Sequence, residues 1–177
     1  MFLYLAMIDS NADKSKFEIL YSEYKNLMYY TANRILRNSS DAEDVVHQAF
    51  LKVIEILDTI SSPRCHKTRA LLVTITEHKA IDLYREKQRR NVLPLAEEYV
   101  GAAPAAEIER LAERDTLAAA VAALLPRYRS VLLLRYDCGY SNAEIANILD
   151  TTEPNVRKLI QRAKEKLSAK LSETEEP

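Results

Sequence analysis

The stretch SNAEIANILDTTEPNVRKLIQRA, residues 141–163, decides the fold of the C-terminal part of the chain. Ser141 stands three residues before Glu144, the spacing of a capping box, and this predicts the start of a short helix. The polar residues after that helix predict a tight turn, with Thr152 as the N-cap of a second helix. Ala146 is small, so the two helices can cross closely. The stretch therefore predicts a helix-turn-helix.

The second of these helices, expected from Glu153 to about residue 171, has two faces when successive residues are placed about 100° apart. The apolar face consists of Val156, Leu159, Ile160, Ala163 and Leu167. The opposite face carries long hydrogen-bond donors: Arg157, Lys158, Gln161 and Arg162. A recognition helix needs this division, because one side packs while the other reaches phosphates and base edges. A solvated basic face on an ordinary helix is the alternative interpretation.

The composition of the whole chain favours helices. Its 177 residues are 47% hydrophobic and 29% charged, which is typical of one or two small globular domains. Only two glycines are present, too few for glycine-rich phosphate loops or for the hairpin turns of an all-β fold. We predict an all-α protein of two small helical domains joined by a flexible linker, with the helix-turn-helix in the second domain. The expected ranges are 1–92 for the first domain, 93–106 for the linker and 107–177 for the second domain.

The individual helices follow from apolar periodicity and capping residues. A short helix is expected within residues 1–8, followed by one with a tyrosine-rich buried face. The next is expected to begin with a capping box at Ser40–Glu43 and to bury Val45, Val46, Ala49, Phe50, Val53 and Leu57. A loop over 60–67 then leads into a helix over 68–90 that is apolar at first and basic later. Further helices are expected over 105–125 and 128–137, the second ended by Gly139.

Charge is distributed unevenly along the chain. The net charge is −1, but residues 126–171 hold nine basic and five acidic residues, a local charge of +4. The acid lies in the middle stretch and in the tail that begins at Ser172. Because binding follows the local field, a basic face for nucleic acid is compatible with a nearly neutral chain.

No arrangement of side chains predicts a reaction. Cys65 and Cys138 form no CxxC pair, and the three histidines lack metal-ligand spacing, so we expect reduced thiols, no metal and no cofactor. No nucleophile–base pair or phosphate loop is recognisable, which speaks against an enzyme. The apolar N-terminus is too short to span a bilayer and lacks the basic start of a signal peptide. We therefore expect a cytoplasmic protein without membrane insertion.

Two sets of motifs occur in order along the chain. The upstream set is Asp41–Phe50 (DAEDVVHQAF) and Ala80–Arg85 (AIDLYR). The downstream set is Leu125-Pro126, Arg129, Val131, Leu134-Arg135-Tyr136, Gly139-Tyr140-Ser141, Glu144-Ile145-Ala146, Val156-Arg157 and Arg162-Ala163-Lys164. These sets resemble regions 2 and 4 of bacterial RNA polymerase sigma factors, over about residues 16–90 and 107–171. A chain with these two regions and a short linker resembles the extracytoplasmic-function (ECF) group.

The resemblance implies a factor that binds RNA polymerase core and directs promoter recognition, DNA opening and transcription initiation. Its implied partners are the β′ clamp helices and the β flap of core polymerase, promoter DNA, and an anti-sigma protein. The capped helix of region 2 is implied to dock on the clamp helices through Asp44, His47, Gln48, Leu51, Lys52 and Glu55. Leu51 is an apolar side chain on an otherwise polar face, as a protein interface requires. The family often has Gln-Glu where this chain has His47-Gln48.

The resemblance also implies two contacts with promoter DNA. Opening at the −10 element needs cations for the displaced strand, and the candidates are Lys67, Arg69, Lys79, Arg85, Lys87 and Arg89. His78 is a further candidate for contact with this element. The family commonly has Trp where this chain has Leu71, so stacking on a base is expected from His66 or His78 instead. The −35 element is expected to contact Asn155, Arg157, Lys158, Gln161 and Arg162. Asn155 lies near the helix N-terminus, where a phosphate is favoured.

An alternative from another class is a stand-alone helix-turn-helix regulator of the LuxR type, which has a similar C-terminal unit. Such a regulator needs a sensory N-terminal domain. A receiver domain would alternate strands with helices around an acidic pocket, whereas residues 1–93 show helical periodicity only. The sigma factor interpretation is therefore preferred.

Overall fold

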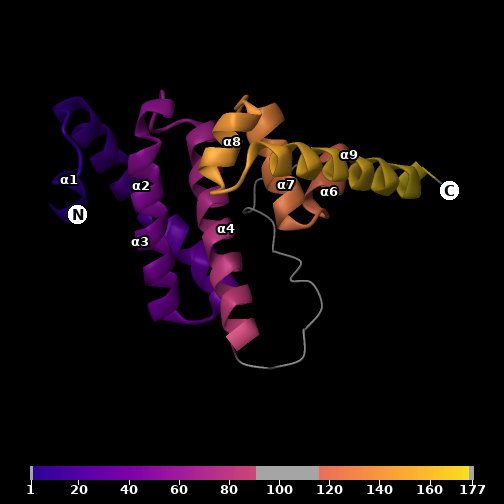
Figure 1. The fold of residues 1–177 in the computed structure, drawn as a ribbon, viewed down its shortest axis with the longest axis horizontal. Helices are drawn as coiled ribbons and strands as arrows, with labels where there is room; N and C mark the ends of the chain where they lie inside the picture. The colour runs from indigo at the N-terminus through magenta and orange to yellow at the C-terminus, as the bar shows by residue number, and fades with distance from the viewer. Residues whose placement is uncertain (1, 91–115, 176–177) are drawn as a thin grey trace. The chain divides into compact units, whose positions relative to one another are not determined.

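The computed structural model describes residues 2–90 and 116–175 and divides the chain into two units, residues 1–93 and 94–177. Every regular element in these described ranges is a helix, as predicted (Figure 1). The predicted linker over 93–106, and the part of the predicted helix over 105–125 that precedes residue 116, lie outside the described residues.

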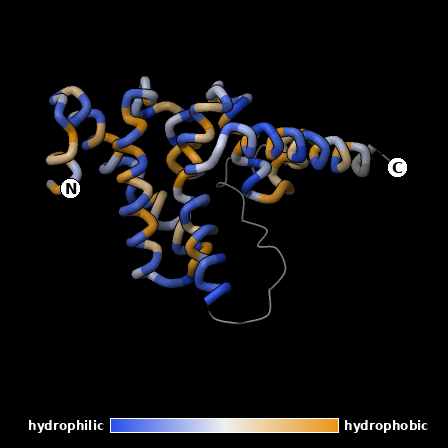
Figure 2. Tube along the Cα trace, in the orientation of Figure 1, coloured by the Kyte–Doolittle hydropathy of each residue, from blue (hydrophilic) through white to orange (hydrophobic). Residues whose placement is uncertain are grey.

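The first unit is built on three long helices that contact one another pairwise: α2 (Asn11–Leu36), α3 (Ser39–Glu55) and α4 (His66–Arg90). A short helix, α1 (Phe2–Leu5), precedes them, and a 3₁₀ turn, η1 (Leu57–Thr59), follows α3. The apolar residues predicted to face inward form the core. Those buried on α2 are Phe17, Leu20, Tyr24, Met28, Ala32 and Ile35. The stripe predicted for the next helix is also buried, although its last member, Leu57, lies in η1 and not on α3. Along the tube in Figure 2, hydrophobic positions alternate with hydrophilic ones as amphipathic helices require.

The junction between α2 and α3 corrects one prediction. Arg37 ends α2 in the left-handed conformation (φ 50°), and Asn38 is the N-cap of α3, its side chain accepting a hydrogen bond from the Asp41 N–H at 3.1 Å. The predicted capping box at Ser40 is therefore wrong, because Ser40 already lies inside the helix. Asn38 takes that role because its short amide reaches the free N–H groups of the first turn.

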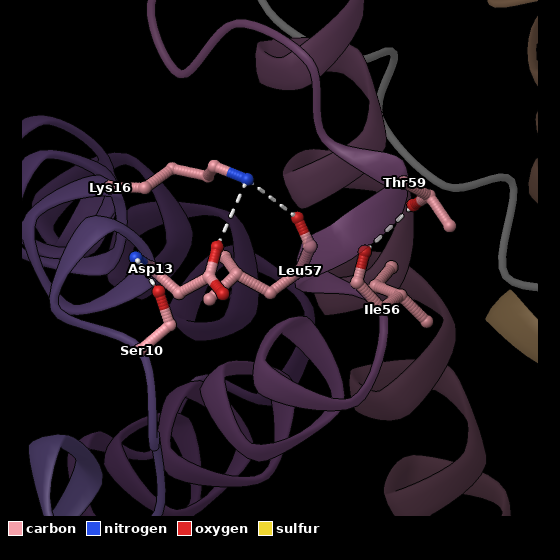
Figure 3. Close-up of polar contacts among 6 residues, drawn as sticks. All are labelled: Ser10, Asp13, Lys16, Ile56, Leu57 and Thr59. Carbon is pink, nitrogen blue, oxygen red and sulfur yellow. Dashed lines mark hydrogen bonds and ion pairs between the residues drawn. The ribbon is translucent and has the colours of Figure 1, made fainter.

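The beginning of α2 holds the turn that follows α3. The Lys16 Nζ atom lies 3.2 Å from the Leu57 carbonyl oxygen, to which it donates, and 3.3 Å from a carboxylate oxygen of Asp13 (Figure 3). Ser10 caps α2 by accepting from the Asp13 N–H, and the Thr59 hydroxyl donates to the Ile56 carbonyl at 2.7 Å. These contacts fix the direction in which the chain leaves α3.

The start of α4 lies two residues earlier than predicted, at His66. The Cys65 carbonyl accepts from the Arg69 N–H at 3.1 Å, and the Cys65 Sγ accepts from the Thr68 N–H at 3.4 Å. A cysteine can thus satisfy free N–H groups at a helix start, a role that propensity scales give to Ser, Thr, Asp and Asn. The predicted loop is correspondingly shorter.

The second unit contains α6 (Thr116–Ala122), α7 (Pro126–Leu132), a π-helical turn η2 (Leu133–Asp137), α8 (Asn142–Ile148) and α9 (Glu153–Glu175). The helix predicted over 128–137 begins earlier, because Pro126 occupies its first turn, and it widens into the π turn. The Cys138 N–H donates to the Leu133 carbonyl, and Gly139 ends the segment with φ 83°, as predicted. In the described ranges, no helix is long and apolar enough to cross a membrane.

Candidate nucleic-acid and polymerase interfaces

The helix-turn-helix consists of α8, a turn and α9. Ser141 and Glu144 form the predicted capping box: the Glu144 N–H donates to the Ser141 hydroxyl oxygen at 3.2 Å, and the Ser141 N–H donates to the Glu144 carboxylate at 2.7 Å. A hydrogen bond with the Ser141 side chain, and next one with the Ser141 backbone, hold the pKa of Glu144 below its ordinary value. Asp150 makes the turn in the left-handed conformation (φ 49°).

The predicted division of α9 into two faces is present. Val156 and Ala163 are fully buried, and this side of α9 contacts α6, α7 and α8. Leu159, Ile160 and Leu167 on the same side are partly buried. All five predicted −35 residues are exposed: Asn155, Arg157, Lys158, Gln161 and Arg162. The packing of three neighbouring helices thus fixes which side of α9 is presented outward.

Three of these exposed side chains form hydrogen bonds with side chains one helical turn away. Arg157 donates to Glu153 at 2.6 Å, Gln161 donates to Glu165 at 3.1 Å, and Asn155 donates to the Thr151 hydroxyl at 3.4 Å. Exposed pairs of this kind contribute at most about 1 kcal/mol and exchange readily for other partners. The acidic partner Glu153 was not singled out from the sequence. Farther along α9, the Nζ atom of Lys164 lies over the Tyr136 ring, 5.2 Å from the ring centroid.

The outer face of α3 holds five of the six side chains predicted to contact polymerase. Asp44, His47, Gln48 and Glu55 are exposed, and Leu51 is partly buried. Lys52 is not on this face: its side chain is only 5% exposed, and its Nζ lies 2.9 Å from a carboxylate oxygen of Glu55. Because the Lys52 side chain is almost fully buried, its predicted position on the outer face is wrong. We use the name "α3 docking face" for the remaining five residues.

A residue that the sequence interpretation missed lies beside this face. The Tyr4 hydroxyl from α1 and the Nδ1 atom of His47 are 2.5 Å apart and share a hydrogen bond. Burial raises the pKa of Tyr4, with a further increase from Tyr21, so the hydroxyl stays protonated at neutral pH. No motif in the sequence links two residues that are so distant along the chain.

The predicted −10 residues all lie on α4 but differ in exposure. Lys67, Arg85, Lys87 and Arg89 are exposed, whereas Arg69, His78 and Lys79 are partly buried. Lys87 pairs with Asp41 on α3, its Nζ lying 2.5 Å from each carboxylate oxygen. Leu71 is fully buried and is not available to a base, whereas His66 is exposed at the first position of α4. The hydrophilic last turns of α4 are visible in Figure 2.

Comparison with known families assigns both units. Residues 20–90 match Sigma-70 region 2, and residues 114–167 match Sigma-70, region 4. The two matches together cover most of the chain, in the order in which the motifs were recognised. A region 2 match across the first unit favours a sigma factor over a regulator of the LuxR type.

Curated relatives agree along nearly the whole chain. The ECF RNA polymerase sigma factor SigL of Mycobacterium tuberculosis is 27% identical over 164 residues, which cover 92% of each chain. The ECF RNA polymerase sigma factor SigW of Bacillus subtilis is 26% identical over 171 residues, which cover 90% of each chain.

Two solved structures are also similar. One is CnrH in complex with the cytosolic domain of CnrY, with a TM-score of 0.39, 26% identity and coverage of 90% of this chain and 89% of that one. The other is the sigma factor RpoE in complex with the anti-sigma factor NepR from Bartonella quintana, with a TM-score of 0.44 and 19% identity, over 86% of this chain and 94% of that one. With regions 2 and 4 both matched and ECF relatives aligned over about nine tenths of their length, this chain belongs to the extracytoplasmic-function group of RNA polymerase sigma factors.

Proposed function

We propose that the exposed face of α9 contacts the −35 element of promoter DNA while the first unit binds RNA polymerase core. The observation that supports this most is the division of α9, whose buried side is fixed by three helices and whose outer side carries five long polar side chains. In a helix-turn-helix, the second helix enters the major groove with its N-terminal residues at the base edges. Asn155, Arg157 and Lys158 lie in those first turns.

The α3 docking face is proposed to bind the β′ clamp helices of core polymerase. Its four exposed polar residues surround the partly buried Leu51, an arrangement with an apolar centre and a polar rim. Contact of the second unit with the β flap is part of the same proposal. Sigma factors act by binding and positioning other molecules, and we assign no reaction to this chain.

The basic residues of α4 are proposed to hold the DNA strands at the −10 element. Arg85 and Arg89 are exposed near its C-terminal end, and Lys67 and His66 are exposed at its start. Because Leu71 is buried, a flipped base is proposed to stack on His66 or on the partly buried His78. Polymerase binding would place the protein in the cytoplasm, and control by an anti-sigma protein stays a prediction from group membership.

The proposal is tested by transcription with purified core polymerase on templates randomised at the −35 element. Alanine variants of Arg157, Lys158, Gln161 and Arg162 are compared, each with its affinity for core measured in parallel. A side chain that reads a base contributes about 1–3 kcal/mol at one position and relaxes preference there, whereas a phosphate contact weakens all sequences alike. We expect lower −35-dependent transcription for Arg157→Ala and Arg162→Ala, and altered base preference for at least one of the four variants.

Two results would contradict the proposal. If all four variants transcribe normally, α9 does not read the promoter. If they lose activity only because core binding is lost, the face belongs to a protein interface instead. Binding of the wild-type chain to core in the absence of DNA is the accompanying control, because a stand-alone regulator would bind its operator and not the core enzyme.

A further inference from the structure

The N-terminal segment, residues 3–8, is anchored in the first unit although it lies outside the region 2 match, which begins at residue 20. Tyr4 and Ile8 are 7% and 6% exposed. The Tyr4 ring centroid lies 5.4 Å from that of Phe17 and 5.9 Å from that of Phe50, and both of those rings are fully buried. A tyrosine inserted among core aromatics holds the segment in place, as such ring pairs contribute beyond the area they bury.

The same tyrosine reaches the α3 docking face. Its hydroxyl shares the 2.5 Å hydrogen bond with His47, and the two ring centroids are 5.2 Å apart. His47 itself is exposed, with Asp44 one turn before it and Leu51 one turn after it on α3. The N-terminal segment therefore borders the α3 docking face and fixes the position of one of its members.

Anchoring through Tyr4 and Ile8 leaves two apolar side chains of the segment in solvent. Leu3 is 68% exposed and Met7 is 54% exposed. They are two of only five large hydrophobic residues that are exposed in the described part of the chain, and they lie within five residues of each other. Grouped apolar side chains beside a polar face are a feature of protein-binding surfaces, and methionine adapts well to a partner.

We propose that the N-terminal segment is part of the surface that binds RNA polymerase core, with Leu3 and Met7 in contact with the enzyme and Tyr4 positioning His47. The proposal rests on the proposed docking of α3. Its occupant is core polymerase because the segment that carries the two apolar side chains is hydrogen-bonded through Tyr4 to His47, a member of the α3 docking face. The alternative of a detachable cover is disfavoured, since leaving would expose two buried apolar side chains.

The first experiment measures the affinity of the full chain for core polymerase after Leu3→Glu and Met7→Glu are combined. Both side chains are exposed, so the melting temperature should stay near that of the wild type. We expect affinity to fall by about tenfold or more, as for central interface residues. The matched control is Tyr30→Glu, which introduces the same charge at an exposed aromatic residue of α2 outside the surface and should leave affinity unchanged.

The outcomes separate this inference from the proposed function. Unchanged affinity for core, together with loss of affinity in Asp44→Lys, would overturn the inference and leave α3 docking intact. Unchanged affinity in both would overturn the docking face itself. Tighter binding of the double variant to core would overturn the inference and show that the segment covers the docking face. A wild-type dimer that the two substitutions dissociate would also overturn it, because the apolar side chains would then bind a second copy of the chain.

A second experiment tests the positioning role of Tyr4 by a double-mutant cycle with His47. Tyr4→Phe keeps the ring in the core and removes only the hydroxyl. If Tyr4 acts through His47, Tyr4→Phe should weaken core binding several-fold in the wild type and have no further effect in His47→Ala. Independent effects in the cycle, or wild-type affinity in Tyr4→Phe, would contradict the positioning role.

Discussion

At the scale of single residues, the caps give the sharpest comparison between sequence and structure. Asn38 and Ser40 lie two positions apart, and the structure gives the capping role to Asn38 alone. Loss of a capping side chain costs about 1 kcal/mol, whereas Ser→Ala inside an exposed helical turn costs nothing or stabilises slightly. We expect Asn38→Ala to lower the free energy of unfolding of the first unit and Ser40→Ala to leave it unchanged. Denaturant unfolding of both variants measures this. A larger loss of stability in Ser40→Ala than in Asn38→Ala would instead support the predicted capping box at Ser40.

The second capping box makes a prediction about pH. Hydrogen bonds from Ser141 depress the pKa of Glu144 in the folded state below its ordinary value of 4.5. A depressed folded pKa stabilises the fold at pH values above the unfolded pKa, and this contribution is lost as the pH falls through the folded pKa. NMR titration of the Glu144 carboxyl should give a midpoint below that of an unstructured glutamate.

The same titration in Ser141→Ala identifies the cause of the depressed pKa. Removal of the hydroxyl should move the Glu144 midpoint toward the ordinary value, while the backbone N–H of residue 141 retains part of the effect. A midpoint that does not move would mean that the hydroxyl contributes nothing. In Glu144→Gln, the loss of stability on acidification should be smaller than in the wild type.

At the scale of elements, apolar periodicity was sufficient to find the helices, but it did not determine the residues at which they begin and end. The buried stripes of α2 and α3 and the two faces of α9 were predictable because packing selects one side of each helix. The early start of α4 at His66, after Cys65, and the π turn before Gly139 were not, since neither a thiol cap nor a widened turn has a distinct sequence signal. Local hydrogen bonds decide such ends.

At Lys52, helical spacing and the resemblance to region 2 pointed to different faces of α3. Lys52 stands seven residues after Val45 and three after Ala49, so helical spacing places it on the buried stripe. The set of polymerase contacts implied by the resemblance to region 2 nevertheless included this lysine. Its long stem can lie along apolar neighbours while the ammonium group reaches Glu55 at the edge. The contact between Tyr4 and His47 had no comparable signal, because tertiary packing alone brings α1 to α3.

The α3 docking face has its own prediction. Asp44→Lys reverses a charge on an exposed side chain, so it should weaken binding to core polymerase and shift stability by within about 0.5 kcal/mol. Leu51→Glu places a charge at the centre of the face and should abolish binding. Because Leu51 is partly buried, its variant must be shown to keep its helical signal and melting temperature. Wild-type affinity in Asp44→Lys and in a folded Leu51→Glu would place the interface elsewhere.

At the scale of the whole molecule, the order of the two motif sets was sufficient to identify both units, although each unit alone is small. The distribution of charge along the chain adds information about DNA binding that the motifs do not give. The net charge is −1, although residues 126–171 carry +4. The acidic residues Glu173, Glu175 and Glu176 follow the basic residues of α9 in sequence, and the first two belong to the last turn of that helix. The acid raises the electrostatic cost of bringing the free chain to the phosphate backbone.

We therefore expect the free protein to bind promoter DNA weakly and to become specific only when it is bound to core polymerase, which adds contacts that the free chain lacks. Replacing Glu173, Glu175 and Glu176 with Gln removes three negative charges from the tail and leaves every proposed contact residue in place. This variant should bind DNA more tightly than the wild type at low salt, and the difference should shrink as salt screens the tail. Fluorescence anisotropy with promoter and scrambled duplexes over a salt series measures both effects.

Tight, sequence-specific binding by the free wild-type chain at physiological salt would contradict the expectation. An unchanged affinity in the glutamine variant would show that the tail does not oppose DNA binding, and the weak binding would then have to arise from the small contact area of α9 alone.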